Sequence, residues 1–251
     1  MIRSTQGGRP GAWLCAGGSD DTMPAMARVT HVHHLAASTA RMREVIEFCT
    51  QVLGMELVGL FDMHGVPGGT HCFLRLDDRS AMSFVLLPAM ADIDEELGVT
   101  HAAHGADTSA PGTMQHLAFG VDSVDDLLAM RDRIRLHGYQ VNGPIDHGFC
   151  RSIYFRGPEG MVLEVSAWIT RIDADRWIDP TAATRCGIDE TDLDRFRHPP
   201  EPDLTGSPVA QPALDPAKPH LRYPDEVLAA LGAMSDDDVA AAMSFTEPPV
   251  P

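Results

Sequence analysis

His34-Leu35-Ala36 occurs a second time in the chain, as His116-Leu117-Ala118, and each copy opens a similar run of predicted elements. In each run an apolar strand carries the His, an amphipathic helix follows and ends at a Gly, and further strands complete the unit. The second run ends in Gly160-Met161-Val162-Leu163-Glu164-Val165. A supersecondary unit that is used twice determines the architecture, so this repeat decides the fold.

The first predicted module covers residues 28–89. Residues 29–36 are strand-like, and residues 40–53 place apolar side chains at the spacing of a helix. Gly54 follows this helix, at a position where glycine is favoured because it adopts the left-handed conformation. Three further strands complete the order β-α-β-β-β, at residues 55–61, 71–76 and 82–87.

The second predicted module covers residues 113–168 and repeats this order. After a strand at residues 114–121, Ser123 and Asp126 resemble a capping box at the start of a helix that ends at Gly138. The remaining strands are predicted at residues 139–142, 152–156 and 161–167.

The segments outside the modules differ from them in composition. Residues 1–27 show no periodicity and are interpreted as a disordered leader, and residues 90–112 as an acidic linker with a short helix at 92–97. Residues 169–251 form a Pro-rich tail, for which two short helices are predicted at residues 224–234 and 236–243. The tail either wraps over the modules or a partner subunit or is disordered; its aromatic residues favour docking, because disordered segments contain few aromatics.

The bulk composition restricts the class of protein. With 251 residues, 44% of them hydrophobic, the chain can bury one substantial core. Its net charge of −17 and the lack of a Lys/Arg cluster exclude nucleic acid and anionic membranes as partners. Five irregularly spaced Cys indicate a reducing compartment. With neither a secretory signal nor an apolar run long enough to span a bilayer, we expect a cytoplasmic protein with a small-molecule substrate.

Strand parity places three potential metal ligands on one side of the predicted sheet. Because side chains alternate with period two, His34 and His116 face away from the leucine that follows each of them. Glu164 shares its strand face with Val162 and Ser166. A carboxylate in the middle of an apolar strand is costly unless it is paired or bound to a metal.

Two imidazoles and one carboxylate form the facial triad that suits Fe(II) and also accepts Mn, Zn, Co or Ni. Three protein ligands leave coordination positions open for a substrate and for O₂ or water. The alternative is that His34 and His116 are polar core residues and that Glu164 pairs with an Arg.

The paired modules with His34, His116 and Glu164 resemble the vicinal oxygen chelate superfamily. It includes glyoxalase I, bleomycin and fosfomycin resistance proteins, methylmalonyl-CoA epimerase and extradiol dioxygenases. Residues 46–55 are similar to the family's first-helix signature, and residues 156–164 to its closing segment, with Gly in place of the usual Asp at position 157. The resemblance covers residues 28–168 and implies an α+β fold, in which two βαβββ modules form one cupped mixed sheet around a single metal site.

The family pattern also selects His34 over its neighbours and separates the subfamilies. His34 stands at the family's distance from Phe48, whereas His31 and His33 are expected on the helix side or at an edge. Glyoxalase I takes a fourth ligand from the last strand of its first module, but residues 83–87 contain no acid or amide. This difference favours the three-ligand site of the extradiol dioxygenases.

Two further residues are candidates for catalysis. Tyr154 lies ten residues before Glu164, as the dioxygenase Tyr does, and its phenol could bond a catecholate oxygen. The dioxygenase acid–base His corresponds to about Ser80 or Ala81 here, and His147 is the best substitute, because imidazole titrates near neutral pH. The alternatives are a strand aromatic and a loop His without a role. The other histidines of this region are interpreted as solvent-exposed: His71, His101 and His104.

The resemblance therefore implies a metal-dependent enzyme, and its most concrete form is an Fe(II)-dependent extradiol-type dioxygenase acting on a small catechol-like substrate. Two other classes stay open: a non-redox metal-dependent lyase or isomerase, and a resistance-type protein that binds a small molecule without turnover. Members of the family often pair their sheets between subunits, so a homodimer is also expected.

Overall fold

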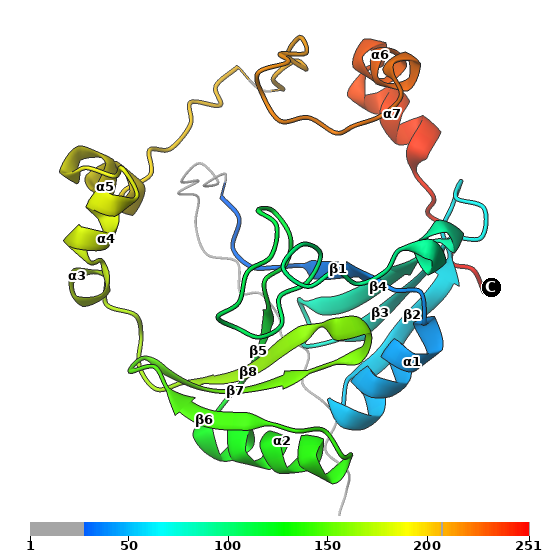
Figure 1. The fold of residues 1–251 in the computed structure, drawn as a ribbon. Helices are drawn as coiled ribbons and strands as arrows, with labels where there is room; N and C mark the ends of the chain where they lie inside the picture. Colours follow the sequence, from blue (N-terminus) through cyan, green and yellow to red (C-terminus); the bar gives the residue numbers. More distant parts are fainter. Residues whose placement is uncertain (1–27, 207, 251) are drawn as a thin grey trace, which may run out of the picture.

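The computed structural model describes residues 28–206 and 208–250, and each predicted module forms its own four-stranded sheet (Figure 1). The strand orders are β1-β4-β3-β2 and β5-β8-β7-β6, with the outer pairs β1·β4 and β5·β8 parallel. The elements of the first module are β1 (His34–Ser38), α1 (Met42–Glu47), the π-helical turn η1 (Phe48–Val52), β2 (Glu56–Asp62), β3 (Thr70–Arg75) and β4 (Ala81–Leu86). Those of the second are β5 (Leu117–Val121), α2 (Val124–Leu136), β6 (Asn142–Asp146), β7 (Cys150–Arg156), η3 (Pro158–Gly160) and β8 (Val162–Trp168).

The α+β class and the two βαβββ modules are confirmed, with some boundaries moved. Strand β1 begins five residues later than predicted, and the predicted strand at 139–142 is wrong, because Tyr139 packs its ring against Phe48 and the strand starts only at Asn142. In the linker, the 3₁₀ helix η2 (Pro88–Asp92) replaces the helix expected at 92–97. The leader at 1–27 lies outside the described residues.

The sheets are separate, whereas one continuous cupped sheet was expected. Within the described part of the chain, β1 pairs only with β4 and β5 only with β8, so the outer edges of both strands carry no partner strand. The modules are joined instead by a shared core on the helix side, where Phe48 of η1 packs against Tyr139 and Phe155 with ring centroids 5.1 and 6.4 Å apart.

Two charged side chains of the second module bind the two ends of the first module's helix. At its start, Glu159 accepts hydrogen bonds from the Thr39 hydroxyl (2.5 Å) and the Ala40 N–H (2.8 Å). At its end, Arg133 of α2 donates to the carbonyls of Gln51 and Val52, both at 2.8 Å. An acid at the N-terminus and a base at the C-terminus both complement the helix dipole. The module-to-module contact therefore also stabilises the helix.

Gly54, two residues after the end of η1, is required by this contact. It has φ +79°, and a Cβ there would lie 3.0 Å from the Arg133 guanidinium. Glycine is consequently the residue that permits both the helix end and the close approach of Arg133.

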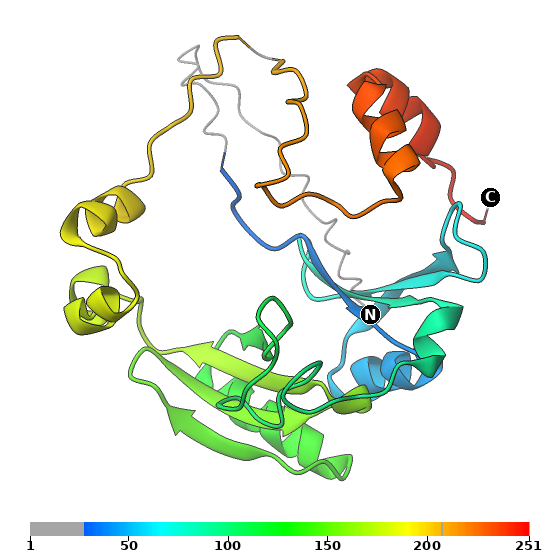
Figure 2. The ribbon, with the colours of Figure 1, turned by 45° about the horizontal axis from the view of Figure 1, so that its top comes forward.

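The C-terminal tail contains five short helices, α3 (Ala174–Trp177), α4 (Pro180–Arg185), α5 (Glu190–Arg197), α6 (Asp225–Ala233) and α7 (Asp236–Met243), the last two as predicted. It leaves the end of β8, forms a wide arc and returns to the first module (Figures 1 and 2). There the Phe245 ring stacks on His64, between β2 and β3, with centroids 4.6 Å apart. None of the described residues belongs to a helix with the length and apolar character needed to cross a bilayer.

We predict that Glu159→Ala lowers the free energy of unfolding by about 2 kcal/mol, because hydrogen bonds to a charged group contribute about 1.5–3 kcal/mol. Thr39, which is 2% exposed, would also lose its hydroxyl partner. Urea unfolding measures the change. The control Glu44→Ala removes an exposed carboxylate paired with Arg41, for which about 1 kcal/mol or less is expected. Equal losses in both variants would contradict the proposed capping role.

Candidate metal centre

The strand registers relate the two modules position by position. In the first module Ala36 of the repeated peptide lies opposite Ser83, and in the second Ala118 lies opposite Glu164. Ser83 is therefore the counterpart of Glu164, which explains why the first module contributes no carboxylate. On the neighbouring strands, Phe73 is opposite Ser83 and Tyr154 is opposite Glu164.

Glu164 is 6% exposed, in the middle of β8. Its Oε2 lies 3.1 Å from Nε2 of His116, and its Oε1 accepts a hydrogen bond from the Ser166 hydroxyl at 2.5 Å. Burial raises the pKa of this carboxyl, but hydrogen bonds from Ser152, Ser166 and Tyr154, and then the nearby His116, outweigh burial and bring the pKa below its ordinary value. The carboxylate is thus held ionised with little access to water.

The donor chemistry of His116 and Glu164 fits a divalent cation. The Gln115 amide donates to the carbonyls of His104 (3.3 Å) and Asp107 (3.0 Å), so its oxygen is left to accept from Nδ1–H of His116. Nε2 of His116 then faces Glu164 Oε2 at 3.1 Å, where either a proton on Nε2 or a cation shared by the two atoms satisfies the pair.

His34 does not join this pair. It is exposed at the start of β1, on the other sheet, with its Nδ1 2.9 Å from Nδ1 of His33 and its ring against Phe73 at 5.5 Å. Among the residues that the structure describes, no three His, Cys, Asp or Glu side chains gather closely enough to hold one ion. The structure therefore brings together two of the three predicted ligands, and the three-ligand site stays a prediction.

Tyr154 and His147 lie next to the His116–Glu164 pair. The Tyr154 hydroxyl is 3.0 Å from Nε2 of His147, and the Tyr154 ring meets the His116 ring edge-to-face at 6.4 Å. Burial, followed by the negative charge of Glu164, raises the pKa of the Tyr154 phenol. A neutral phenol, an imidazole and a carboxylate that share one face can orient an oxygen-bearing ligand and hold a proton beside it.

The turn that carries His147 is packed against the beginning of the tail. Phe149 meets Trp177 of α3 edge-to-face at 4.8 Å, and its carbonyl accepts the N–H of Ile169 at 2.9 Å. Gly148 leaves room for the indole, since a Cβ there would lie 3.1 Å from it. A tryptophan in the tail was the one sequence feature that pointed to this support.

The linker between the modules also reaches the site. At Gly105 the linker passes the Tyr154 ring, with 3.5 Å between the ring and the position that a Cβ would take. Gln115 fastens the same loop through two backbone carbonyls. The acidic linker is thus part of the surroundings of Tyr154 and His116.

The expectation that His71 is solvent-exposed is wrong. His71 is half-buried on β3 beside Phe61 and Phe73, and its Nε2 is buried without a hydrogen-bond partner in the described part of the chain. Burial, and secondly the nearby His34, lowers the pKa of its imidazole.

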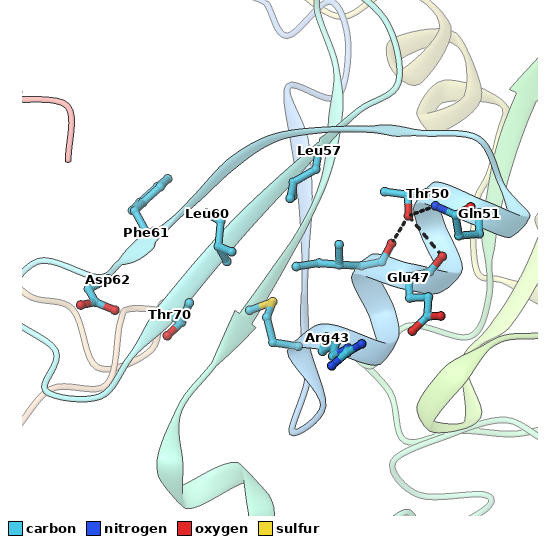
Figure 3. A pocket seen from close by; sticks show the side chains of 11 residues that line it. Arg43, Glu47, Thr50, Gln51, Leu57, Leu60, Phe61, Asp62 and Thr70 are labelled. Carbon is cyan, nitrogen blue, oxygen red and sulfur yellow. Dashed lines mark hydrogen bonds between the residues drawn. The ribbon is translucent and has the colours of Figure 1, made fainter. Parts of the chain in front are cut away.

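A cavity of about 930 Å³ lies elsewhere, between α1–η1 and strands β2 and β3 (Figure 3). Met42, Ile46, Leu57 and Leu60 give it an apolar wall, and Thr50 turns its hydroxyl back to the Ile46 carbonyl at 2.8 Å. None of the predicted site residues lines this cavity, so the cavity is not a second metal centre of the predicted kind.

Comparison with known families identifies the superfamily of the chain. The model of the Glyoxalase/Bleomycin resistance protein/Dioxygenase superfamily matches residues 31–165, which is more than half of the chain. The chain belongs to this superfamily. The matched residues contain both modules of the superfamily fold and every predicted site residue, and they end before the tail.

Individual relatives of the superfamily are distant. The chain is 25% identical over 132 residues to biphenyl-2,3-diol 1,2-dioxygenase 2 of Rhodococcus globerulus, a match that spans 53% of the chain and only 60% of that relative. A glyoxylase/bleomycin resistance protein/dioxygenase domain from Frankia sp. EAN1pec is 16% identical, with 56% of this chain and 99% of that domain covered and a TM-score of 0.43. The fosfomycin resistance protein FosX of Listeria monocytogenes, solved with Mn(II) and sulfate, is 15% identical, with 56% and 93% covered and a TM-score of 0.38.

We predict that Glu164→Gln lowers the pKa of Tyr154, because the negative charge of Glu164, which raises this pKa, is removed. Ultraviolet absorbance of the phenolate during an alkaline titration measures the shift. The chain has three tyrosines, and Tyr154→Phe identifies which titration step belongs to Tyr154. An unchanged Tyr154 step in Glu164→Gln would show that the two side chains are not coupled.

Proposed function

We propose that this protein is a metal-dependent enzyme, and specifically an Fe(II)-dependent extradiol-type dioxygenase acting on a small catechol-like substrate. The observation that carries the proposal is the convergence of His116 Nε2 and Glu164 Oε2 at 3.1 Å beside the Tyr154–His147 pair. The distant similarity to a biphenyl-diol dioxygenase supports the same reaction class.

In this proposal His116, Glu164 and His34 hold the metal ion. A bound Fe(II) supplies the redox chemistry that ring cleavage by O₂ requires. The Tyr154 hydroxyl orients a substrate oxygen by hydrogen bonding, and its raised pKa keeps it a donor at neutral pH. Nε2 of His147, 3.0 Å from that hydroxyl, receives or returns the substrate proton.

A homodimer is the second part of the proposal. Strands β1 and β5 begin at or next to His34 and His116, and within the described residues neither has a partner strand on its outer edge. Free strand edges are templates for pairing with another chain. Edge-to-edge pairing of β1 with β5 of a second copy would bring the two histidines to one boundary.

A non-redox lyase or isomerase is the alternative, and one observation favours it. Ala81, where the dioxygenase pattern places an acid–base His, lies directly opposite His34 in the register of β1 and β4, and it has no titratable group. A Lewis-acid metal enzyme requires no O₂.

We predict that Glu164→Ala and His116→Ala each lower the affinity for Fe(II) by more than about 100-fold, since even residues that only support a ligand contribute about 10–100-fold. Metal analysis of anaerobically reconstituted protein measures the loss. His34→Ala should also lose affinity, whereas the adjacent control His33→Ala should not. Full metal occupancy in Glu164→Ala would contradict the site.

The reaction class is tested by O₂ uptake on a panel of catechols, with matched aerobic and anaerobic assays. Ring-cleavage products formed only with iron and O₂ support the dioxygenase. Anaerobic turnover with Zn, Ni, Co or Mn supports the lyase or isomerase, and tight ligand binding without metal or turnover would overturn both.

We predict that His147→Gln lowers kcat by about 100-fold or more, because a positioned acid–base group contributes roughly 10²–10⁴-fold. The pH–rate profile should lose one limb, while the affinity for the metal should not change. His137→Gln, at the exposed end of α2, is the matched control. An unaltered pH profile would exclude His147 from proton transfer.

A further inference from the structure

We propose that Ser166 and Ser152 are positioning residues that hold Glu164 so that it binds a metal through one oxygen only. This inference rests on the proposed metal site. It assigns a role to two hydroxyls that touch neither a substrate nor the metal.

The two serines, Ser152 buried and Ser166 half-buried, form a donor chain that ends on the carboxylate. Ser166 donates to Glu164 Oε1 at 2.5 Å, and the Ser152 and Ser166 hydroxyl oxygens are 2.7 Å apart. Because Ser166 gives its one hydrogen to Glu164, Ser152 is placed to donate to Ser166, and the same hydroxyl lies close enough to Glu164 to lower the pKa of the carboxyl. Cys150 lies 3.7 Å behind Ser152 and can donate to it in turn. Ser152 is 0% exposed, so water does not compete for its hydroxyl.

The first module serves as an internal comparison. By register, the counterparts of Ser166 and Ser152 are Val85 and His71, which face each other on β4 and β3. The first module therefore lacks the carboxylate and the hydroxyl pair together. Since the fold of the module forms without serines at these two positions, the serines occur together with the carboxylate and are not required by the fold.

The hydrogen bond determines which carboxylate oxygen remains available. Oε1 is taken by Ser166, while Oε2 faces His116 at 3.1 Å. A carboxylate with one oxygen committed to a buried donor acts as a monodentate ligand. A monodentate Glu164 leaves one more coordination position open than a bidentate one, and open positions are what a substrate needs.

The test is Co(II) binding to the full chain. Two quantities are measured: the affinity for Co(II), and the intensity of the Co(II) ligand-field absorption, which depends on the coordination number. Ser166→Ala should lower the affinity about 10–100-fold, in the range of residues that support metal ligands. Its absorption should weaken as the freed carboxylate becomes bidentate and raises the coordination number. Ser166→Thr keeps the hydroxyl and should restore affinity and spectrum, and Ser152→Ala should show a smaller effect in the same direction.

Ser83→Ala is the matched control, since it removes a buried hydroxyl at the counterpart of Glu164, where Ser83 donates to the Leu35 carbonyl at 3.2 Å. It should leave Co(II) affinity and spectrum unchanged. Thermal unfolding without metal identifies a variant that fails to fold, in which case Ser166→Thr and Ser152→Ala decide. Wild-type affinity and spectrum in a folded Ser166→Ala, or an equal loss in Ser83→Ala, overturns the positioning role alone. Absence of Co(II) binding by the unaltered chain overturns the metal site as well.

Discussion

A carboxylate in the middle of strand β8 must keep its charge with almost no water around it, and the second module is arranged around this requirement. Glu164 faces a hydroxyl on its own strand, an imidazole just before β5 and a phenol on β7. Because burial of an unpaired charge is strongly unfavourable, Glu164 needs these polar partners in place to stay ionised. Ser83, in the same register position of the first module, has no charge to satisfy, and its surroundings are aromatic and apolar.

The joint between the modules is a second constraint. The two halves share a core and a helix rather than a sheet, since side chains of the second module bind both ends of the first module's helix. This arrangement leaves the outer edges of β1 and β5 free of partner strands in the described chain, with His34 and His116 near them. The distance between His34 and Glu164 therefore depends on which strand pairs with these two edges.

Much of the architecture could be predicted from sequence because it is local or periodic. The repeated His-Leu-Ala peptide predicted the two modules, and Gly54 and Gly138 predicted the ends of the two helices. Parity placed Ser166 on the face of Glu164, which was the only sequence signal for its role. Contacts between distant segments could not be predicted, because nothing in the sequence pairs Gln115 with loop carbonyls or Trp177 with Phe149. The prediction of one continuous sheet was wrong for the same reason, because the sequence of a strand does not identify which strand pairs with its edge.

The packing of Trp177 against the His147 turn has a practical consequence for where the chain can be cut. The family match ends at residue 165, and a fragment designed to that limit, extended only to the end of β8, would retain both sheets. It would lack the indole that backs Phe149 and Gly148, together with the backbone bond from Ile169. The length of chain that contains both sheets is thus shorter than the length that supports the His147 turn.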